Sequence, residues 1–158
     1  MPFRPPNVEP VLAVGMPFSK HYGWLSGFLF PFLSIVFFDA ATGKVGQWTW
    51  ITGTTYGVLG LGAAWFFRNR KPTRANFVLY GILGALVYDA VTGLTIGPLF
   101  FGQSFIEALI GQIPFTINHV LGNVVFSLVV SPLVYRWVVM NRSLEANSIL
   151  AKLGFRRA

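Results

Sequence analysis

Two copies of one aspartate motif occur in a chain that is otherwise poor in acidic residues. Residues 37–44 read FFDAATGK and residues 87–94 read VYDAVTGL, so Asp-Ala-x-Thr-Gly recurs fifty positions apart in a sequence with five Asp and Glu residues. Each copy follows a long apolar run. A carboxylate in such a place is costly unless it reaches water, a partner or a ligand. Asp39 and Asp89 are therefore candidate functional residues.

Part of this motif also has a structural explanation. A glycine just past the last helical turn is a common C-cap, and Thr and Asp are ordinary residues at a helix end. A carboxylate there, however, faces the negative end of the helix dipole, which favours a specific partner or a wet cavity. Capping, a ligand site and coupling-ion chemistry all remain open for the two aspartates.

A second polar group follows the second copy of the motif. It comprises Gln103, Glu107, Gln112, Asn118, His119 and Asn123. Gln103 and Glu107 are four positions apart and share a helix face. Amides and an imidazole without partners in lipid would be strongly destabilising, so the group must face protein or a cavity. These residues either bond one another between helices or contact a ligand.

Trp48 and Trp50 in the stretch GQWTW are the remaining site candidates. Tryptophans near a membrane surface usually form an aromatic belt, and the alternative is a stacking wall for a flat ring. The chain has no cysteine, and it contains no P-loop, nucleotide-binding glycine fingerprint or paired-histidine metal spacing. We therefore expect neither an enzyme nor a bound cofactor or metal.

The elements that must position these residues follow from the composition. Hydrophobic residues make up 54% of the 158 residues and charged residues 11%, against about 25% charged in an ordinary soluble domain. This composition predicts an all-α integral membrane protein, a compact bundle of about six membrane helices. Because the basic residues cluster between apolar runs, the net charge of +7 indicates membrane orientation and not nucleic-acid binding.

Four long spans are expected, and two shorter apolar segments complete the six. The long spans are 22–40, 47–67, 75–96 and 116–138, and the short segments are 9–18 and 102–115. Each short segment could be a short tilted helix, a half-helix or a re-entrant piece, and for 102–115, which ends at Ile113-Pro114, a half-helix fits better than a full crossing. Residues 1–142 would form one domain, followed by a basic tail at 143–158, which either lies along the membrane or is solvated.

Basic residues also predict the orientation. The 68–74 loop and the C-terminus are rich in Lys and Arg and should be cytoplasmic. Both aspartates then lie at the outer ends of parallel helices, and 97–115 begins and ends on the outer side. Small-residue patterns such as Gly53-x-x-x-Gly57 and Gly60-x-x-x-Ala64 predict close helix contacts, either within the chain or between subunits.

Residues 88–137 resemble a known family. The Asp-x-x-Thr-Gly turn, then IPF, HVLGN and SPL before a basic end, are similar to the second half of the S component, the substrate-binding membrane subunit of energy-coupling factor (ECF) vitamin transporters. FLFPFLSIVFFDAATG also resembles a helix of this family. The likeness extends over roughly 22–138. The family's Ala-x-x-x-Ala coupling pattern is not found in the first segment, which reads VLAVGMPF.

The resemblance implies capture of a vitamin-like molecule from outside, with a transmembrane coupling subunit and two cytoplasmic ATPases as partners. Asp39 and Asp89 would order the outer loops or contact the ligand, the two tryptophans would stack on a ring, and the amides, Glu107 and His119 would supply hydrogen bonds. Two other classes remain open. One is a stand-alone proton-coupled carrier, and the other is a structural membrane protein without a ligand.

Overall fold

The computed structural model describes residues 8–141 and Leu144, and this part of the chain is almost entirely helical, with no strand. The elements in order are α1 (Val11–Tyr22), α2 (Trp24–Thr42), α3 (Gln47–Arg68), α4 (Arg74–Asp89), the π-helix η1 (Ala90–Ile96), α5 (Gly97–Phe101), α6 (Phe105–Val134) and the π-helix η2 (Tyr135–Val139). The expected all-α fold is confirmed. The predicted tail at 143–158 lies outside the described residues, apart from Leu144.

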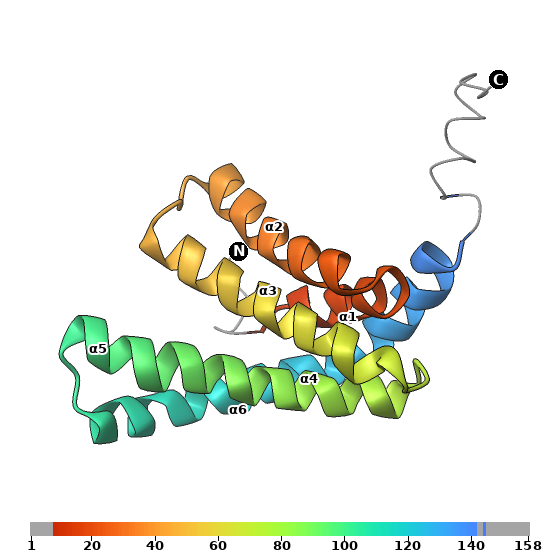
Figure 1. The fold of residues 1–158 in the computed structure, drawn as a ribbon. Coiled ribbons are helices and arrows are strands. Elements are labelled where there is room, and N and C mark those ends of the chain that lie inside the picture. The colour runs from red at the N-terminus through yellow and green to blue at the C-terminus, as the bar shows by residue number, and fades with distance from the viewer. Residues whose placement is uncertain (1–7, 142–143, 145–158) are drawn as a thin grey trace.

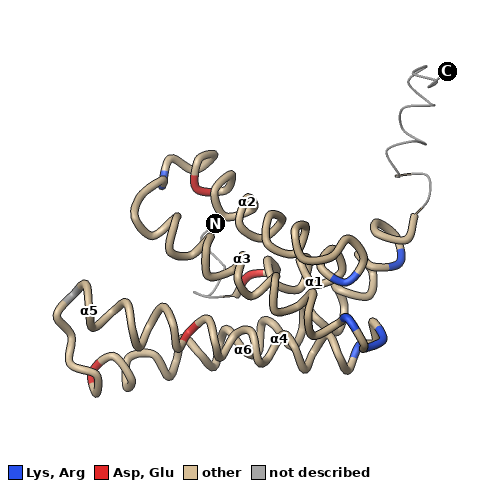
Figure 2. Tube along the Cα trace, in the orientation of Figure 1, with Lys and Arg blue, Asp and Glu red and all other residues tan. Residues whose placement is uncertain are grey.

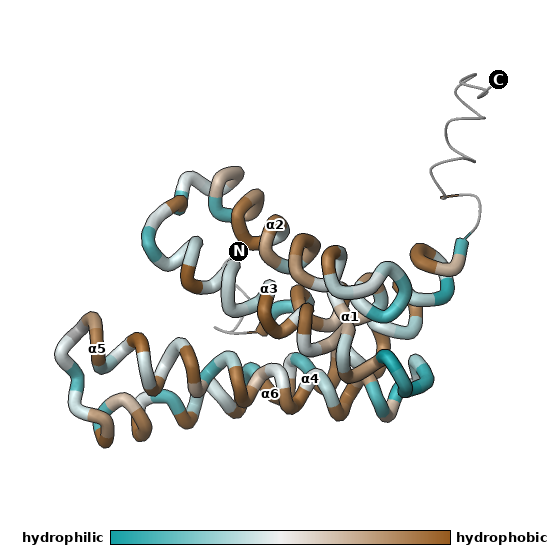
Figure 3. Tube along the Cα trace, viewed as in Figure 1, coloured by the Kyte–Doolittle hydropathy of each residue, from teal (hydrophilic) through white to brown (hydrophobic). Residues whose placement is uncertain are grey.

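Three segments have the length and composition of membrane-spanning helices. They are Trp24–Thr42, Arg74–Phe100 and Phe105–Val139, and Figure 3 shows apolar residues recurring along all three. They correspond to three of the four long spans that the sequence predicts. The fourth, 47–67, forms the 22-residue helix α3. It is less apolar because it contains Gln47 and four threonines.

The expected count of six membrane segments is not supported. The first short segment becomes α1, whose 12 residues span only about 18 Å at 1.5 Å per residue. The prediction of a separate half-helix at 102–115 is wrong. Gly97–Phe101 extends the arm begun by α4, and α6 starts at Phe105 and runs through Pro114 without a break. A proline is tolerated inside a membrane helix because neighbouring groups satisfy the freed carbonyl.

The helices form two hairpins joined by α1. The first hairpin pairs α2 with α3, and the second pairs the arm α4–η1–α5 with α6 (Figure 1). Helix α1 packs against α2, α3, α4 and α6. Its residues Leu12, Ala13 and Met16 are buried in the main apolar core. Protein therefore surrounds this short helix, which is the condition for a short element at membrane depth.

Glycines bring the helices of the first hairpin into backbone contact. A Cβ added to Gly60 would lie 1.7 Å from the carbonyl oxygen of Gly27. Gly53 and Gly57 of the same helix face aromatic rings of α2. In the second hairpin, Gly81 of α4 lies against Ser127 of α6. The small-residue patterns thus serve contacts within the chain.

Charge separates the two ends of the molecule. Figure 2 shows Lys and Arg at the α1–α2 junction, in the α3–α4 loop and in η2, all at one end. The α2–α3 loop and the α5–α6 turn lie at the opposite end, where Lys44 is the exception to the charge pattern. The helices therefore alternate in direction as predicted. The prediction that both aspartates lie at outer helix ends holds for Asp39, in the last turn of α2, but is wrong for Asp89, because η1 and α5 continue the helical arm from Asp89 to Phe101.

Candidate functional site

A cavity of about 500 Å³ lies between the start of α3 and the far part of the second hairpin. We call it the tip cavity. Glycines form part of its wall, and its side chains include Trp48, Tyr88, Gln103, Glu107, Gln112 and Phe115. Its volume is typical of small-molecule sites. Three of the nine predicted site residues, Trp48, Gln103 and Glu107, therefore line one cavity.

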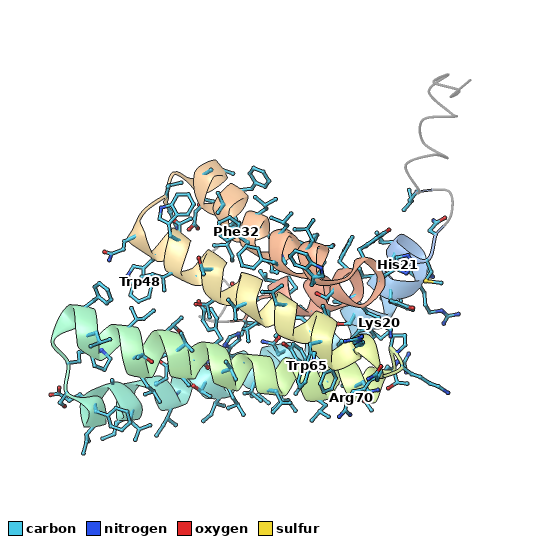
Figure 4. The ribbon with its side chains drawn as sticks, in the orientation of Figure 1. Lys20, His21, Phe32, Trp48, Trp65 and Arg70 are labelled. Carbon is cyan, nitrogen blue, oxygen red and sulfur yellow. The ribbon has the colours of Figure 1, made fainter. Side chains whose placement is uncertain are left out.

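The tip cavity combines aromatic surfaces with amide groups. Figure 4 shows Trp48 reaching from the start of α3 towards the α4–α5 arm, and this residue is 43% exposed. Tyr88 supplies a second ring from α4, and the amides of Gln103 and Gln112 come from the α5–α6 turn and from α6. Rings with a few convergent polar groups suit a flat molecule that carries hydrogen-bonding atoms.

Gly93 allows the closest approach inside this wall. A Cβ at this position would lie 2.2 Å from Oε1 of Gln112, so any side chain here would displace that amide. A helix C-cap was one of the explanations that the sequence left open for the glycine of each motif copy. That explanation is wrong for Gly93, because the helix continues through it as η1. The glycine instead leaves space for a cavity residue.

Glu107 has a structural role besides lining the cavity. The backbone N–H and the hydroxyl of Ser104 lie 3.0 Å and 2.9 Å from Glu107 Oε2, and the Glu107 N–H lies 3.3 Å from Ser104 Oγ. This reciprocal capping box satisfies donors at the start of α6. One carboxylate oxygen of Glu107 is thus engaged within the chain.

Asp39 and Trp50 do not line the tip cavity. The hydroxyl of Thr49 donates to Asp39 Oδ2 at 2.6 Å, which ties the end of α2 to the start of α3. Gly43 follows with a left-handed φ of 66° and ends α2. Trp50 lies beside Phe32 of α2, with ring centroids 6.4 Å apart. The first motif copy therefore acts as a helix cap and an interhelical tie.

Asp89 lies in the core and pairs with a second predicted residue. Its Oδ1 is 3.0 Å from His119 Nδ1, and the two residues are 2% and 1% exposed. The amide of Asn123 donates to the His119 carbonyl at 3.0 Å. Asn118, next to His119 in the chain, is half-buried and does not line the tip cavity. The structure thus brings Asp89, His119 and Asn123 together beside the cavity.

A line of four polar side chains runs through the core. The Tyr56 hydroxyl contacts Glu9 Oε1 and lies 3.2 Å from His119 Nε2, and His119 in turn meets Asp89. We call Glu9, Tyr56, His119 and Asp89 the polar line. It joins the start of α1 to α3, α6 and α4. Every residue of this line depends on another for a charge or hydrogen-bond partner, which makes it sensitive to substitution.

Tyr88 separates the polar line from the tip cavity. Its ring stacks on Tyr56 at 4.5 Å and meets the His119 ring edge-on at 5.3 Å. The same residue lines the cavity. An occupant of the cavity that moves this ring would therefore also disturb the packing around the polar line.

Glu9, Tyr56 and Tyr88 were not among the site residues predicted from the sequence, and Gln112 belonged to the second polar group without being predicted as a site residue. A signal was present for Glu9, which is one of five acidic residues and begins an apolar segment. The signal for Tyr56 was weaker: it is a residue with a hydroxyl in the middle of a predicted span. Tyr88 and Gln112 could not be predicted in this way, because the sequence does not show which side of each helix meets its neighbour.

Comparisons with family models, with curated proteins and with solved structures gave no match. Within the described residues, no three His, Cys, Asp or Glu side chains come together as possible metal ligands. The geometry of the tip cavity and of the polar line is therefore the basis for a functional proposal.

Proposed function

We propose that this chain is the substrate-binding subunit of an importer, like the S component of ECF transporters, and holds a vitamin-like molecule in the tip cavity. The observation that carries the proposal is the cavity itself. Trp48 and Tyr88 provide faces on which a planar ring can stack, and Gln103 and Gln112 provide amide donors and acceptors. A cavity of about 500 Å³ accommodates a molecule of vitamin size.

We propose an orientation in which the tip cavity faces the outer side of the cell membrane. Cytoplasmic segments are enriched in Lys and Arg, and in this chain the basic end is opposite the cavity. A solute could then enter from outside without crossing the bilayer. The basic 68–74 loop would face the cytoplasm.

Partner subunits would supply the energy for uptake. The sequence contains no nucleotide-binding loop, so ATP-driven import requires other chains. Following the resemblance, we propose a transmembrane coupling subunit and two cytoplasmic ATPases. The present chain would contribute selectivity, because it provides the cavity and its amides.

The test is to purify the protein in mild detergent and identify any bound small molecule by native mass spectrometry. We expect one vitamin-like compound at a stoichiometry near one. The Gln103→Ala/Gln112→Ala variant should lose it, because both cavity amides are removed. The matched control is Asn118→Ala, which removes an amide from the same helix outside the cavity. No bound compound after growth in rich medium, or equal loss in both variants, would contradict the proposal.

The polar line favours a second candidate, a stand-alone proton-coupled carrier. Buried ionisable residues within membrane helices are often parts of proton pathways, and Asp89 and His119 are paired in the core. A carrier should move its solute into proteoliposomes along a pH gradient without ATP, and Asp89→Asn should abolish this movement. Uptake only after addition of the coupling subunit and ATPases would decide for the importer subunit.

A further inference from the structure

The basic end contains a second cavity with chemistry unlike that of the tip cavity. It has a volume of about 620 Å³ and lies where the α1–α2 junction meets the last two turns of α3. We call it the basic cavity. Its walls include Lys20, His21, Trp24, Leu61, Trp65 and Arg68. Gly23 forms the junction with a left-handed φ of 82°, so α2 turns back directly beside α1.

Two cations of the basic cavity have no acidic residue beside them. No Asp or Glu is among the described residues that line it. Lys20 is half-buried, and its Nζ donates to the Phe67 carbonyl at 2.6 Å, which fixes the ammonium at the end of α3. Arg68 is the last residue of α3 and is exposed. An ammonium and a guanidinium that share one cavity attract a phosphate group.

The rim of the basic cavity is aromatic and apolar. Trp24 and Trp65 are 69% and 80% exposed, and Figure 4 shows Trp65 at the same end as Lys20 and Arg70. Exposed indoles are typical of the level where lipid headgroups meet acyl chains. Arg70 lies over the Phe66 ring at 4.5 Å, so its guanidinium is engaged outside the cavity.

We propose that the basic cavity binds the phosphate headgroup of an anionic phospholipid. Arg68 and Lys20 contact the phosphate, and the glycerol and first acyl carbons lie against Trp24, Leu61 and Trp65. A lipid fits better than a soluble phosphate, because Trp24 begins a membrane-spanning segment and leads directly into its apolar surface. This inference does not depend on the solute that the tip cavity holds.

The test is to delipidate the detergent-purified protein and titrate it with short-chain phosphatidylglycerol, with phosphatidylcholine and with inorganic phosphate, counting bound molecules by native mass spectrometry. Phosphatidylglycerol should bind with a stoichiometry of one, and the other two should bind much more weakly. Arg68→Gln should weaken phosphatidylglycerol binding roughly fivefold, the effect expected for one cation near an anionic headgroup. Lys20→Gln should have a similar effect.

The matched control is Lys44→Gln, which makes the same charge change at the opposite end of the molecule. It should leave the affinity for phosphatidylglycerol unchanged. If Lys20→Gln does not fold because its contact with α3 is lost, the affinity of Arg68→Gln for phosphatidylglycerol alone tests the proposal. Equal weakening by Lys44→Gln, equal binding of phosphatidylcholine, or displacement of the lipid by inorganic phosphate would overturn the proposal.

Discussion

The two copies of Asp-Ala-x-Thr-Gly have the same local hydrogen bond but opposite surroundings. In both copies the threonine hydroxyl donates to the carbonyl four residues earlier, at 2.9 Å for Thr42 and 2.8 Å for Thr92. The first copy ends its helix in a turn near the surface. The second continues into η1, with its aspartate buried against His119. Local sequence therefore determined the threonine contact, whereas tertiary packing determined the role of the aspartate and the glycine.

The two hairpins also differ in the contacts that hold their helices together. The first is held by backbone contact between α2 and α3 at Gly27 and Gly60. The second is held partly by polar contacts between α4 and α6, among them the pair of Asp89 and His119. Substitutions should separate these two modes of packing. A steric change should disrupt the first hairpin, and a change of charge should disrupt the second.

The largest effect is expected from Asp89→Asn compared with Asp39→Asn. Asp89 is 2% exposed and its Oδ1 lies 3.0 Å from His119 Nδ1, so Asp89→Asn weakens a buried hydrogen bond to a carboxylate, and such bonds contribute about 1.5–3 kcal/mol. Asp39 is half-buried and accepts from a hydroxyl, a bond that an asparagine oxygen can still accept, so its loss should be below about 1 kcal/mol. The measurement is SDS-induced unfolding in detergent micelles, followed by circular dichroism. Equal losses would contradict the difference between the copies.

Gly60→Ala should disrupt the first hairpin by sterics alone. The new methyl would meet the Gly27 carbonyl, and forcing helices apart in this way typically costs about 1–3 kcal/mol. The matched control is Gly111→Ala, where an added Cβ meets nothing within 4 Å. That control should be neutral or slightly stabilising, because alanine is the better helix former. Thermal unfolding in detergent would compare the two, and an unchanged melting temperature for Gly60→Ala would contradict the contact.

Tyr56→Phe should weaken the polar line without changing its shape. The variant keeps the ring that stacks on Tyr88 but removes the hydroxyl between Glu9 and His119. Leaving buried groups without a partner costs about 1–3 kcal/mol. The control Tyr88→Phe removes only a 3.5 Å contact with Thr52 and should cost less. A stability ranking in the reverse order would show that the polar line is not a structural unit.

The smallest effects should distinguish the two motif glycines. Gly43→Ala places a side chain at a left-handed φ of 66° and should cost about 1 kcal/mol of stability. Gly93→Ala would push the Gln112 amide aside and should change ligand binding more than stability. Melting curves and titration with the co-purified ligand measure both properties. Identical profiles for the two variants would contradict their separate roles.

Much of the fold was predictable from hydrophobicity and charge. Apolar length predicted four long spans, of which three have the length and composition to cross a membrane, and basic loops predicted the alternation of helix directions. Pro114 led to the wrong prediction of a helix end, because a proline that would end a helix in water is tolerated inside a packed membrane helix. Gly93 was misleading for a similar reason. It repeats the residues around Gly43, yet packing of η1 against α6 keeps the chain helical there.

The candidate site was predictable only in part. Polarity in an apolar chain was enough to select Asp89, His119 and Asn123, which meet in the core. It could not decide between Trp48 and Trp50, because residues two positions apart on a helix face different neighbours. Nor could it find the contact between Glu9 and Tyr56, which joins elements separated by 47 positions.

The most direct test of the tip cavity uses this pair of tryptophans. The small molecule that co-purifies with the protein would be titrated calorimetrically into the wild type, Trp48→Ala and Trp50→Ala. Trp48→Ala removes a stacking ring from the cavity and should therefore bind the molecule at least about tenfold more weakly, which is about 1.4 kcal/mol. Trp50→Ala should bind it with the affinity of the wild type. Equal affinities in all three proteins, or equal losses in both variants, would contradict a ligand site in the tip cavity.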